Sequence, residues 1–223
     1  EIDVPCFKIA SGDMTDIPLI KHVAKMHKPM IISTGLANMD EVENAVNACL
    51  YEGNRKIILL HCIAHYPTEP HETNLLAMDT LRKKFQCPIG YSDNGEPLLV
   101  DIVAASMGAN IIEKHFTLNT KFKGPDHKAS LDYNELKDYI NKIKTVKIVL
   151  GSKIKKVTFN ESKNIRLVRK SLYAKTKILK GEIFTQKNVI AKRPLGGIPA
   201  NKLKDILGKK SRKNFEVDEK IQL

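Results

Sequence analysis

The sequence lacks several features that would assign it to a class at once. Its four cysteines, at positions 6, 49, 62 and 87, include no C-x-x-C pair, which argues against a zinc knuckle. Free thiols in apolar stretches act as small hydrophobic groups, so we expect a reducing, cytoplasmic compartment. No run of about 18 apolar residues occurs, and we therefore expect no membrane span.

The first residues also lack the marks of a targeting sequence. Residues 1–4 read E-I-D-V, without the basic and apolar regions of a signal peptide. The chain does not begin with Met, and a strand-like segment follows almost immediately at residues 7–10. We expect from this that a further portion of the protein precedes Glu1.

Charge is distributed unevenly along the 223 residues. Residues 1–150 carry 17 Lys and Arg against 19 Asp and Glu, a net charge of −2, whereas residues 151–223 carry 20 against 6, a net charge of +14. This asymmetry predicts two regions with different roles. The basic region suits a solvated surface, attraction of anionic substrates or nucleic-acid binding. Its few aromatic residues and lack of an arginine-rich helix disfavour nucleic acid as a partner.

Residues 1–150 alternate short apolar runs with helix-like segments. Predicted strands cover residues 7–10, 30–33, 57–62, 89–92 and 111–114, and predicted helices cover 16–27, 40–52, 74–85, 97–107 and 133–150. The second helix is the best marked, because Asn38 or Asp40 can cap it and apolar residues then recur at helical spacing. This alternation predicts β-α units around a parallel sheet.

Polar residues at the ends of the predicted strands favour a barrel over an open sheet. No G-x-G-x-x-G sequence follows any strand, as would be typical of a doubly wound nucleotide-binding sheet. Polar residues follow every strand: Lys8 and Ser11, Ser33 and Thr34, His61 and Tyr66, Ser92 and Asp93, Glu113 and His115. In a (β/α)₈ TIM barrel these ends converge on one rim, and a closed barrel needs about three more units upstream.

The pattern changes after residue 150. Residues 151–165 form a lysine-rich stretch that we interpret as a linker, and residues 166–223 contain shorter apolar segments separated by Gly and Pro turns. The latter predict a small β-rich domain, close to the lower size limit for independent folding. Residues 1–150 would then be a partial TIM-barrel domain.

Two groups of residues suggest chemistry at the predicted rim. His115 either ligates a divalent metal or shuttles a proton, or is a hydrogen-bonded structural histidine. Lys8, Ser11, Ser33 and Ser92 supply an ammonium and hydroxyls that suit a phosphate dianion, although each Ser-Gly or Thr-Gly pair alone is also typical of a turn. Three such strand ends on one rim favour the phosphate interpretation.

Several motifs carry a family resemblance. Residues 7–130 contain, in order, F-K-I-A-S-G-D, I-I-S-T-G-L, L-L-H-C-I-A-H-Y-P-T, I-G-Y-S-D-N, I-I-E-K-H-F-T and K-G-P-D-H-K-A-S, and the C-terminal region contains R-K-S-L-Y-A, I-L-K-G-E-I and A-K-R-P-L-G-G-I-P. The first set resembles the sialic acid synthase family, which covers N-acetylneuraminate, legionaminate and pseudaminate synthases. The second set resembles the antifreeze-like (SAF) domain that closes these enzymes.

The resemblance implies an activity and roles for individual residues. Phosphoenolpyruvate would condense with an N-acetylated hexosamine, either N-acetylmannosamine or a 2,4-diacetamido hexose, to a nine-carbon 2-keto sugar acid and phosphate. Lys8, Ser11, Ser33 and Ser92 would bind phosphoenolpyruvate, and His115 and Asn94 would ligate Mn²⁺ or Mg²⁺. Tyr66 and Asp126 would contact the sugar and, with His115, act in catalysis. Arg193 would reach the sugar in the partner's barrel, which implies a domain-swapped homodimer.

The sequence departs from the family's motifs at two positions. The metal-binding strand of the family ends S-D-H, whereas this chain has Ser92-Asp93-Asn94. An amide oxygen is a harder and weaker ligand than imidazole, so Asn94, Asp93 or a water would complete the metal site. Ala64 also stands where a polar side chain is usual. Another metal-dependent TIM-barrel aldolase, or a basic nucleic-acid-binding module, is the alternative interpretation.

Overall fold

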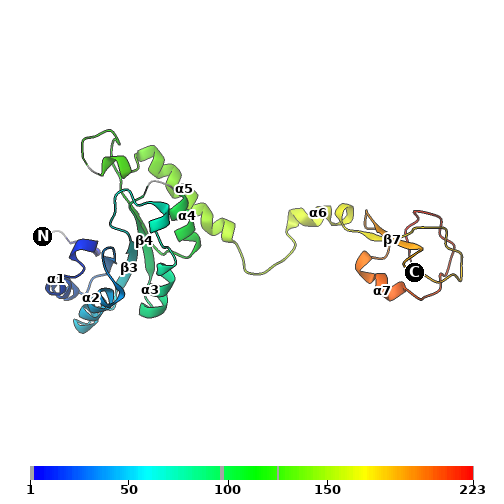
Figure 1. Ribbon diagram of the computed structural model, residues 1–223, viewed down its shortest axis with the longest axis horizontal. Helices are drawn as coiled ribbons and strands as arrows, with labels where there is room; N and C mark the ends of the chain where they lie inside the picture. Colours follow the sequence, from blue (N-terminus) through cyan, green and yellow to red (C-terminus); the bar gives the residue numbers. More distant parts are fainter. Residues whose placement is uncertain (1–2, 96–97, 125, 223) are drawn as a thin grey trace. The chain divides into compact units, whose positions relative to one another are not determined.

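The chain divides into two compact units between Gly151 and Ser152 in a computed structural model, which describes residues 3–95, 98–124 and 126–222 (Figure 1). Each unit has a hydrophobic core of its own. In the part of the chain that the structure describes, no helix is long and apolar enough to cross a membrane.

The first unit alternates strands and helices, as the sequence predicts. Its strands are β1 Phe7–Ile9, β2 Met30–Ser33, β3 Ile57–Cys62, β4 Ile89–Asp93 and β5 Ile112–Lys114. Its helices are α1 Ile17–Ala24, α2 Met39–Tyr51, α3 Ala77–Phe85, α4 Leu98–Ser106 and α5 Tyr133–Leu150, with short 3-10 helices η1 Ser11–Asp13, η2 Pro70–Glu72 and η3 His127–Ala129. Pro97, where we predicted the fourth helix to begin, lies outside the described residues.

The five strands form one parallel sheet in the order of the chain, β1-β2-β3-β4-β5. The register places Lys8 opposite Ile31 on the neighbouring strand, and Ser92 opposite Glu113. A parallel sheet whose sequential strands are neighbours is the arrangement of a barrel wall, and it brings the carboxyl ends of all five strands to one edge.

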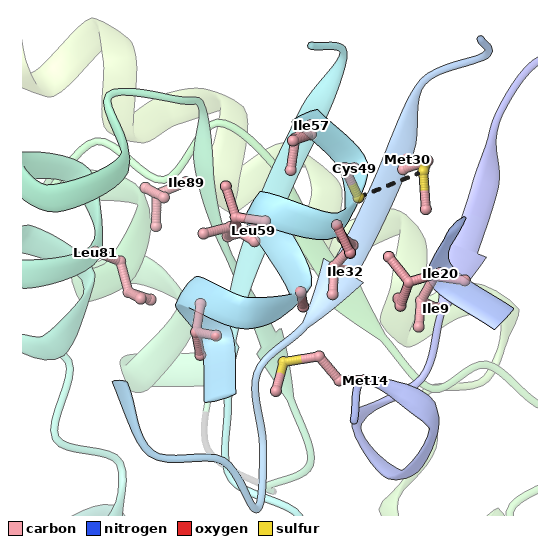
Figure 2. Close-up of a cluster of buried hydrophobic side chains, with 14 of the residues drawn as sticks. Ile9, Met14, Ile20, Met30, Ile32, Cys49, Ile57, Leu59, Leu81 and Ile89 are labelled. Carbon is pink, nitrogen blue, oxygen red and sulfur yellow. Dashed lines mark hydrogen bonds between the residues drawn. The ribbon is translucent and has the colours of Figure 1, made fainter. Parts of the chain in front are cut away.

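Helices α1 to α4 cover one face of the sheet and fill the core. Ile20, Met30, Ile32, Leu59 and Ile89 are completely buried where strands and helices meet (Figure 2). Cys49 on α2 lies 3.8 Å from the Met30 sulfur, so this thiol packs as the small hydrophobic group that the sequence predicts. Each large aliphatic side chain buried in this way contributes about 1.5–3 kcal/mol to stability.

Side-chain caps fix where the helices begin. Asn38 accepts hydrogen bonds from the backbone N–H groups of Asp40 and Glu41, while the Glu41 side chain accepts from the Asn38 N–H. Of the two possible caps for α2, the structure therefore uses Asn38. This reciprocal capping box satisfies donors that a helix leaves unpaired, and it anchors α2 directly after the β2 strand end.

One ion pair shows that the sheet curls. Lys8 on β1 and Glu113 on β5 lie at opposite edges of the sheet, yet the Lys8 Nζ is 3.3 Å from the Glu113 Oε1. In a flat sheet the two strands would be about 19 Å apart, a gap too wide for one lysine and one glutamate side chain to close. The curvature confirms a barrel segment and excludes a flat open sheet.

The second unit is small and rich in short β pairings, as predicted. Strand β6 Ser171–Ala174 pairs antiparallel with β7 Val189–Lys192, and single bridges join Ile178 to Phe215 and Tyr173 to Lys220. Its core is built from eight buried side chains: Leu172, Ala174, Ile178, Phe184, Val189, Ile206, Phe215 and Ile221. The unit also contains α6 Phe159–Val168, η4 Ala200–Lys202 and α7 Leu203–Ile206.

The predicted linker differs from the observed structure in its second half. We interpreted residues 151–165 as a connector, but α6 begins at Phe159, within this stretch. Thr158 accepts a hydrogen bond from the Glu161 N–H, and the Glu161 side chain accepts from the Thr158 N–H. This capping box starts a helix despite the lysine-rich composition around it.

Candidate active site

The candidate site lies on the inner face of the curved sheet, at the carboxyl ends of its strands. Ile9, Ile32, Leu59 and Tyr91 face the helices and belong to the core. Because successive side chains of a strand point to opposite faces, Lys8, Ser33 and Ser92 project to the inner face. Three residues predicted from separate parts of the sequence therefore share one face.

Glu113 links the Lys8 and Ser92 side chains. The Ser92 hydroxyl donates to the Glu113 Oε1 at 2.8 Å, and the same oxygen accepts the Lys8 ammonium at 3.3 Å. The Lys8 and Glu113 side chains are 35% and 42% exposed, so the pair is open to a ligand. An ammonium, a hydroxyl and a carboxylate thus meet at the centre of the inner face.

Ser33 and Ser11 lie at the ends of the two neighbouring strands. The Ser33 hydroxyl is buried and has no hydrogen-bond partner among the described residues, which leaves a donor available to a ligand. The Ser11 hydroxyl accepts the Gly35 N–H at 3.1 Å. A Cβ on Gly35 would lie 2.7 Å from the Ser11 oxygen, so this close approach requires glycine.

His115 borders a small cavity beyond the ends of β4 and β5. The cavity measures about 210 Å³ and is lined by Ser92, Asp93, Glu113, Lys114 and His115. The His115 ring makes an edge contact with the Tyr66 ring, with 5.6 Å between the ring centres. Tyr66 follows β3, so this contact connects the ends of non-adjacent strands β3 and β5.

Asp126 lies near the same end of the sheet. The loop that carries it leaves after His115 and returns at Leu131, whose N–H donates to the His115 carbonyl at 3.0 Å. Partial burial raises the pKa of the Tyr66 hydroxyl, and the nearby Cys62, Asp126 and Glu113 add to the rise. The influence of Asp126 on the Tyr66 pKa places both residues predicted to contact a sugar at this end of the sheet.

Asn94 is fixed by the loop that follows β3. Its side-chain N–H donates to the Ile63 backbone carbonyl at 2.8 Å, and the backbone carbonyl of Asn94 accepts the Thr68 N–H at 3.0 Å. The amide oxygen therefore remains the atom that can coordinate. His65 is exposed and pairs with Glu72 at 2.8 Å, so it does not replace the polar side chain that Ala64 lacks.

The donor set fits a weakly held, hard divalent cation. His115 offers an imidazole and Asn94 an amide oxygen, with Glu113 and Asp126 nearby, whereas the Asp93 carboxylate is taken up by Lys114. Across residues 3–95, 98–124 and 126–222, no three His, Cys, Asp or Glu side chains form a ready metal cluster. A Mn²⁺ or Mg²⁺ ion held by two side chains would keep several waters, as Mg²⁺ in particular usually does.

Arg193 belongs to the second unit. It is exposed and follows β7, and the carbonyl of the next residue, Pro194, accepts the hydroxyls of Ser171 and Tyr173, each at 2.9 Å. These bonds fix the backbone on which the guanidinium is presented. An anchored but solvent-facing arginine is suited to contacting a ligand outside its own unit.

Sequence reasoning missed the direct contacts of Glu113. It noted this residue only as a neighbour of His115, whereas the structure places it against both Lys8 and Ser92. Side-chain alternation along β5 was the available signal, because it places Glu113 on the face opposite to Lys114.

The comparisons with known proteins decide the family. The sequence matches the NeuB family over residues 1–155 and the SAF domain over residues 169–222. The chain belongs to the NeuB family. This confirms the resemblance to sialic acid synthases, with an SAF domain at the C-terminal side.

Individual relatives of this NeuB chain agree with the match. An N,N'-diacetyllegionaminic acid synthase from Campylobacter jejuni is 44% identical over 224 residues, which cover 100% of this chain and 67% of that protein. A pseudaminic acid synthase from Helicobacter pylori is 35% identical, over 95% of this chain and 62% of that protein. The NeuB chain thus spans about two thirds of the length of these relatives.

A solved structure shows the same fold. The crystal structure of an N-acetylneuraminic acid synthetase from Leptospira borgpetersenii, in complex with citrate, aligns with a TM-score of 0.66 at 33% identity. The alignment covers 73% of this chain and 56% of that chain. The curled parallel sheet of the NeuB chain is therefore part of a TIM-barrel synthase fold.

Proposed function

We propose that the protein condenses phosphoenolpyruvate with an N-acetylated hexosamine, giving a nine-carbon 2-keto sugar acid and phosphate. The observation that carries this proposal is the meeting of Lys8, Ser92 and Glu113 on the inner face, beside His115. The proposal also rests on the relatives, which are named as synthases of legionaminic, pseudaminic and N-acetylneuraminic acids.

Lys8 and three serines would bind the phosphate of phosphoenolpyruvate. The Ser33 hydroxyl is buried without a partner, and Ser92 donates only to Glu113 among the described residues. A dianion entering this face would accept from these hydroxyls and from the Lys8 ammonium. Such charge-assisted hydrogen bonds are roughly twice as strong as neutral ones.

The reaction balances without an external oxidant or reductant. C3 of phosphoenolpyruvate forms a bond to the aldehyde carbon of the open-chain sugar, and a water adds at C2. Cleavage of the C2–O bond then releases phosphate and leaves the 2-keto acid. His115 and Asn94 would hold a divalent cation, which when bound supplies Lewis-acid polarisation of the aldehyde oxygen.

Tyr66 and Asp126 would orient the sugar, with Tyr66 as the proton donor and Asp126 as the proton acceptor. The Tyr66 hydroxyl is protonated at neutral pH, as tyrosine ordinarily is, and partial burial raises its pKa further. It can therefore donate to a sugar oxygen, while the exposed Asp126 carboxylate accepts from a hydroxyl. Placing donor and acceptor on opposite sides of one ligand would fix its orientation for attack.

Arg193 would complete the sugar site from a second copy of the chain. The guanidinium is anchored on a fixed backbone and faces solvent in its own unit. Its planar fork of donors suits the amide carbonyl and hydroxyl oxygens of an acetamido sugar. We propose a domain-swapped homodimer on this basis.

A substrate panel tests the proposed function. Full-length protein would be incubated with phosphoenolpyruvate, Mn²⁺ and, in separate reactions, N-acetylmannosamine or a 2,4-diacetamido hexose, and free phosphate would be measured. We expect phosphate release that depends on one of these sugars. Release that needs a different aldehyde would indicate another aldolase, and no release with any sugar would refute the proposal.

A further inference from the structure

The cavity beside His115 is lined in part by a buried ion pair, Asp93 with Lys114. Asp93 on β4 and Lys114 on β5 lie directly opposite each other in the parallel register, and the Lys114 ammonium contacts the Asp93 carboxylate. Their side chains are 1% and 5% exposed. A charged pair buried this deeply carries a desolvation cost, so it calls for an explanation other than simple stability.

Each member of the pair stands between two residues of the candidate site. Ser92 and Asn94 flank Asp93, while Glu113 and His115 flank Lys114. Because side chains alternate along a strand, the pair points to the helix face, whereas Ser92 and Glu113 point to the inner face. Asn94 and His115 directly follow the ends of the two strands. The register repeats this arrangement, since Ser92 lies opposite Glu113 one step along the strands.

The pair is held by directional bonds on all sides. The Lys114 ammonium also donates to the Gly95 carbonyl, and the Asp93 Oδ1 accepts the Gly95 N–H at 2.9 Å and the Tyr91 hydroxyl at 3.4 Å. These contacts fix the turn after β4 as well as the strand ends. Any slip of β4 against β5 would break several of them together.

We propose that the Asp93–Lys114 pair positions the active site by locking the ends of β4 and β5 in register. As positioning residues, the two would set the separation of Ser92 from Glu113 and of Asn94 from His115. The expected effect on catalysis rests on the proposed function. The expected effect on the separation of the strand ends does not. Apolar residues could hold the strands together equally well, but without the same directional bonds.

A double substitution separates positioning from stability. Asp93→Leu with Lys114→Met removes both charges, and an apolar replacement of a whole buried pair often preserves stability. We expect the urea midpoint of the full-length double variant to stay near that of the wild type. We also expect the Kd for phosphoenolpyruvate, measured by calorimetry without metal or sugar, to rise at least ~10-fold, and kcat/KM to fall ~100-fold.

The matched control is Glu43→Gln with Lys84→Met. This pair joins α2 to α3 at 2.7 Å on the surface, away from the strand ends, and we expect its removal to leave both measurements unchanged. If the Asp93/Lys114 double variant keeps both the stability of the wild type and its Kd for phosphoenolpyruvate, the pair is merely structural and the proposal is wrong. If that variant does not fold, Asp93→Asn keeps the side-chain shape, and an unchanged Kd there overturns the proposal equally.

A crystal structure of the double variant gives a readout that does not depend on the reaction. We expect the Ser92 hydroxyl to move out of hydrogen-bond distance from Glu113, which is 2.8 Å in the intact site. An unchanged contact would contradict positioning. A wild-type protein that neither binds nor consumes phosphoenolpyruvate would instead refute the proposed function, and the crystal structure would still decide the inference.

Discussion

Lys8 reaches across the inner face to Glu113, so a phosphate bound as proposed would have to share or replace that carboxylate partner. The ammonium is one-third exposed and lies 3.3 Å from Glu113. A dianion offers it more charge than one carboxylate does, and the flexible lysine can turn toward it. In the proposed function, Glu113 would hold the Lys8 ammonium on the inner face until the phosphate binds.

Replacing Lys8 tests its role as the phosphate cation. Lys8→Met keeps the length of the side chain but removes its charge. Because a hydrogen bond to a charged group contributes about 1.5–3 kcal/mol, we expect the KM for phosphoenolpyruvate to rise roughly 10- to 100-fold. Steady-state kinetics with each substrate varied in turn would measure this, with the exposed Lys25→Met as control. An equal rise in the sugar KM would contradict the assignment.

Asp101 is a buried carboxyl with an unusual environment. It lies on α4, is completely buried, and its oxygens have no hydrogen-bond partner within the described residues. Burial raises its pKa from 3.8 to about 7, with a further rise from Asp93 that Lys114 and the Tyr139 hydroxyl oppose. The group therefore keeps its proton in the folded protein up to neutral pH.

This raised pKa predicts a pH-dependent loss of stability. Between pH 4 and pH 7 the unfolded chain releases the Asp101 proton while the folded chain keeps it, so the free energy of unfolding falls as pH rises through this window. Asp101→Asn removes the titration. We expect the variant to gain on the order of 2 kcal/mol relative to wild type between pH 5 and pH 7 in urea unfolding. A difference that is constant with pH would refute this.

At the scale of elements, Gly90 shows why β4 and β5 approach as they do. A Cβ at this position would lie 2.4 Å from the Ile111 carbonyl oxygen and 2.5 Å from the Leu60 side chain. The first contact is with backbone, which cannot rotate away. The strand pairing that positions Ser92 and Glu113 therefore depends on glycine at position 90, where a side chain would not fit.

Gly90→Ala should separate these strands. Because the added methyl group meets backbone, we expect a loss of about 1–3 kcal/mol in the free energy of unfolding, as for other overpacked sites. Chemical denaturation would measure the loss. Gly12→Ala is the matched control, since nothing lies within 4 Å of its Cβ position. Equal stability of the two variants would show that β5 can shift without cost.

The order of strands and helices could be predicted from the sequence because each element carries its own signal. The five predicted strands match β1 to β5 to within one residue at each end, since apolar runs and turn residues bound them clearly. Helix α6 was missed, although Thr158 and Glu161 form a capping-box signature. We interpreted this stretch as a linker from its lysine-rich composition and gave the capping-box signature no weight.

The contacts of the site could be predicted only in part. The sequence places polar residues at strand ends, and the parallel topology then brings those ends to one edge. The sequence does not reveal the curvature of the sheet that brings Lys8 to Glu113. The distance between these two side chains depends on packing across all five strands. The Asp93–Lys114 pairing likewise needs the register of β4 against β5.

At the scale of the whole molecule, the basic charge lies mostly beyond residue 150. Residues 151–223 carry a net charge of +14. If a partner's SAF domain covers the barrel mouth, this charge would attract anionic phosphoenolpyruvate and speed its association. In the proposed function, attraction of an anionic substrate would account for the charge without a nucleic-acid partner.

Replacing Arg193 tests the proposed exchange between subunits. We expect Arg193→Ala to raise the sugar KM at least ~10-fold, since a charged hydrogen-bonding group is lost, while light scattering still shows a dimer. Arg212→Ala, an exposed arginine of the same unit, is the control. An unchanged sugar KM, or a monomeric wild-type protein, would contradict the swapped arrangement.

A crystal structure of the full-length protein with bound phosphoenolpyruvate tests most directly whether these strand-end side chains form one binding site. We expect the phosphate to contact the Lys8 ammonium and the hydroxyls of Ser33 and Ser92, with His115 facing the enolpyruvyl carbon chain. A phosphate bound elsewhere, or the four side chains directed to separate faces, would contradict the synthase assignment of this site.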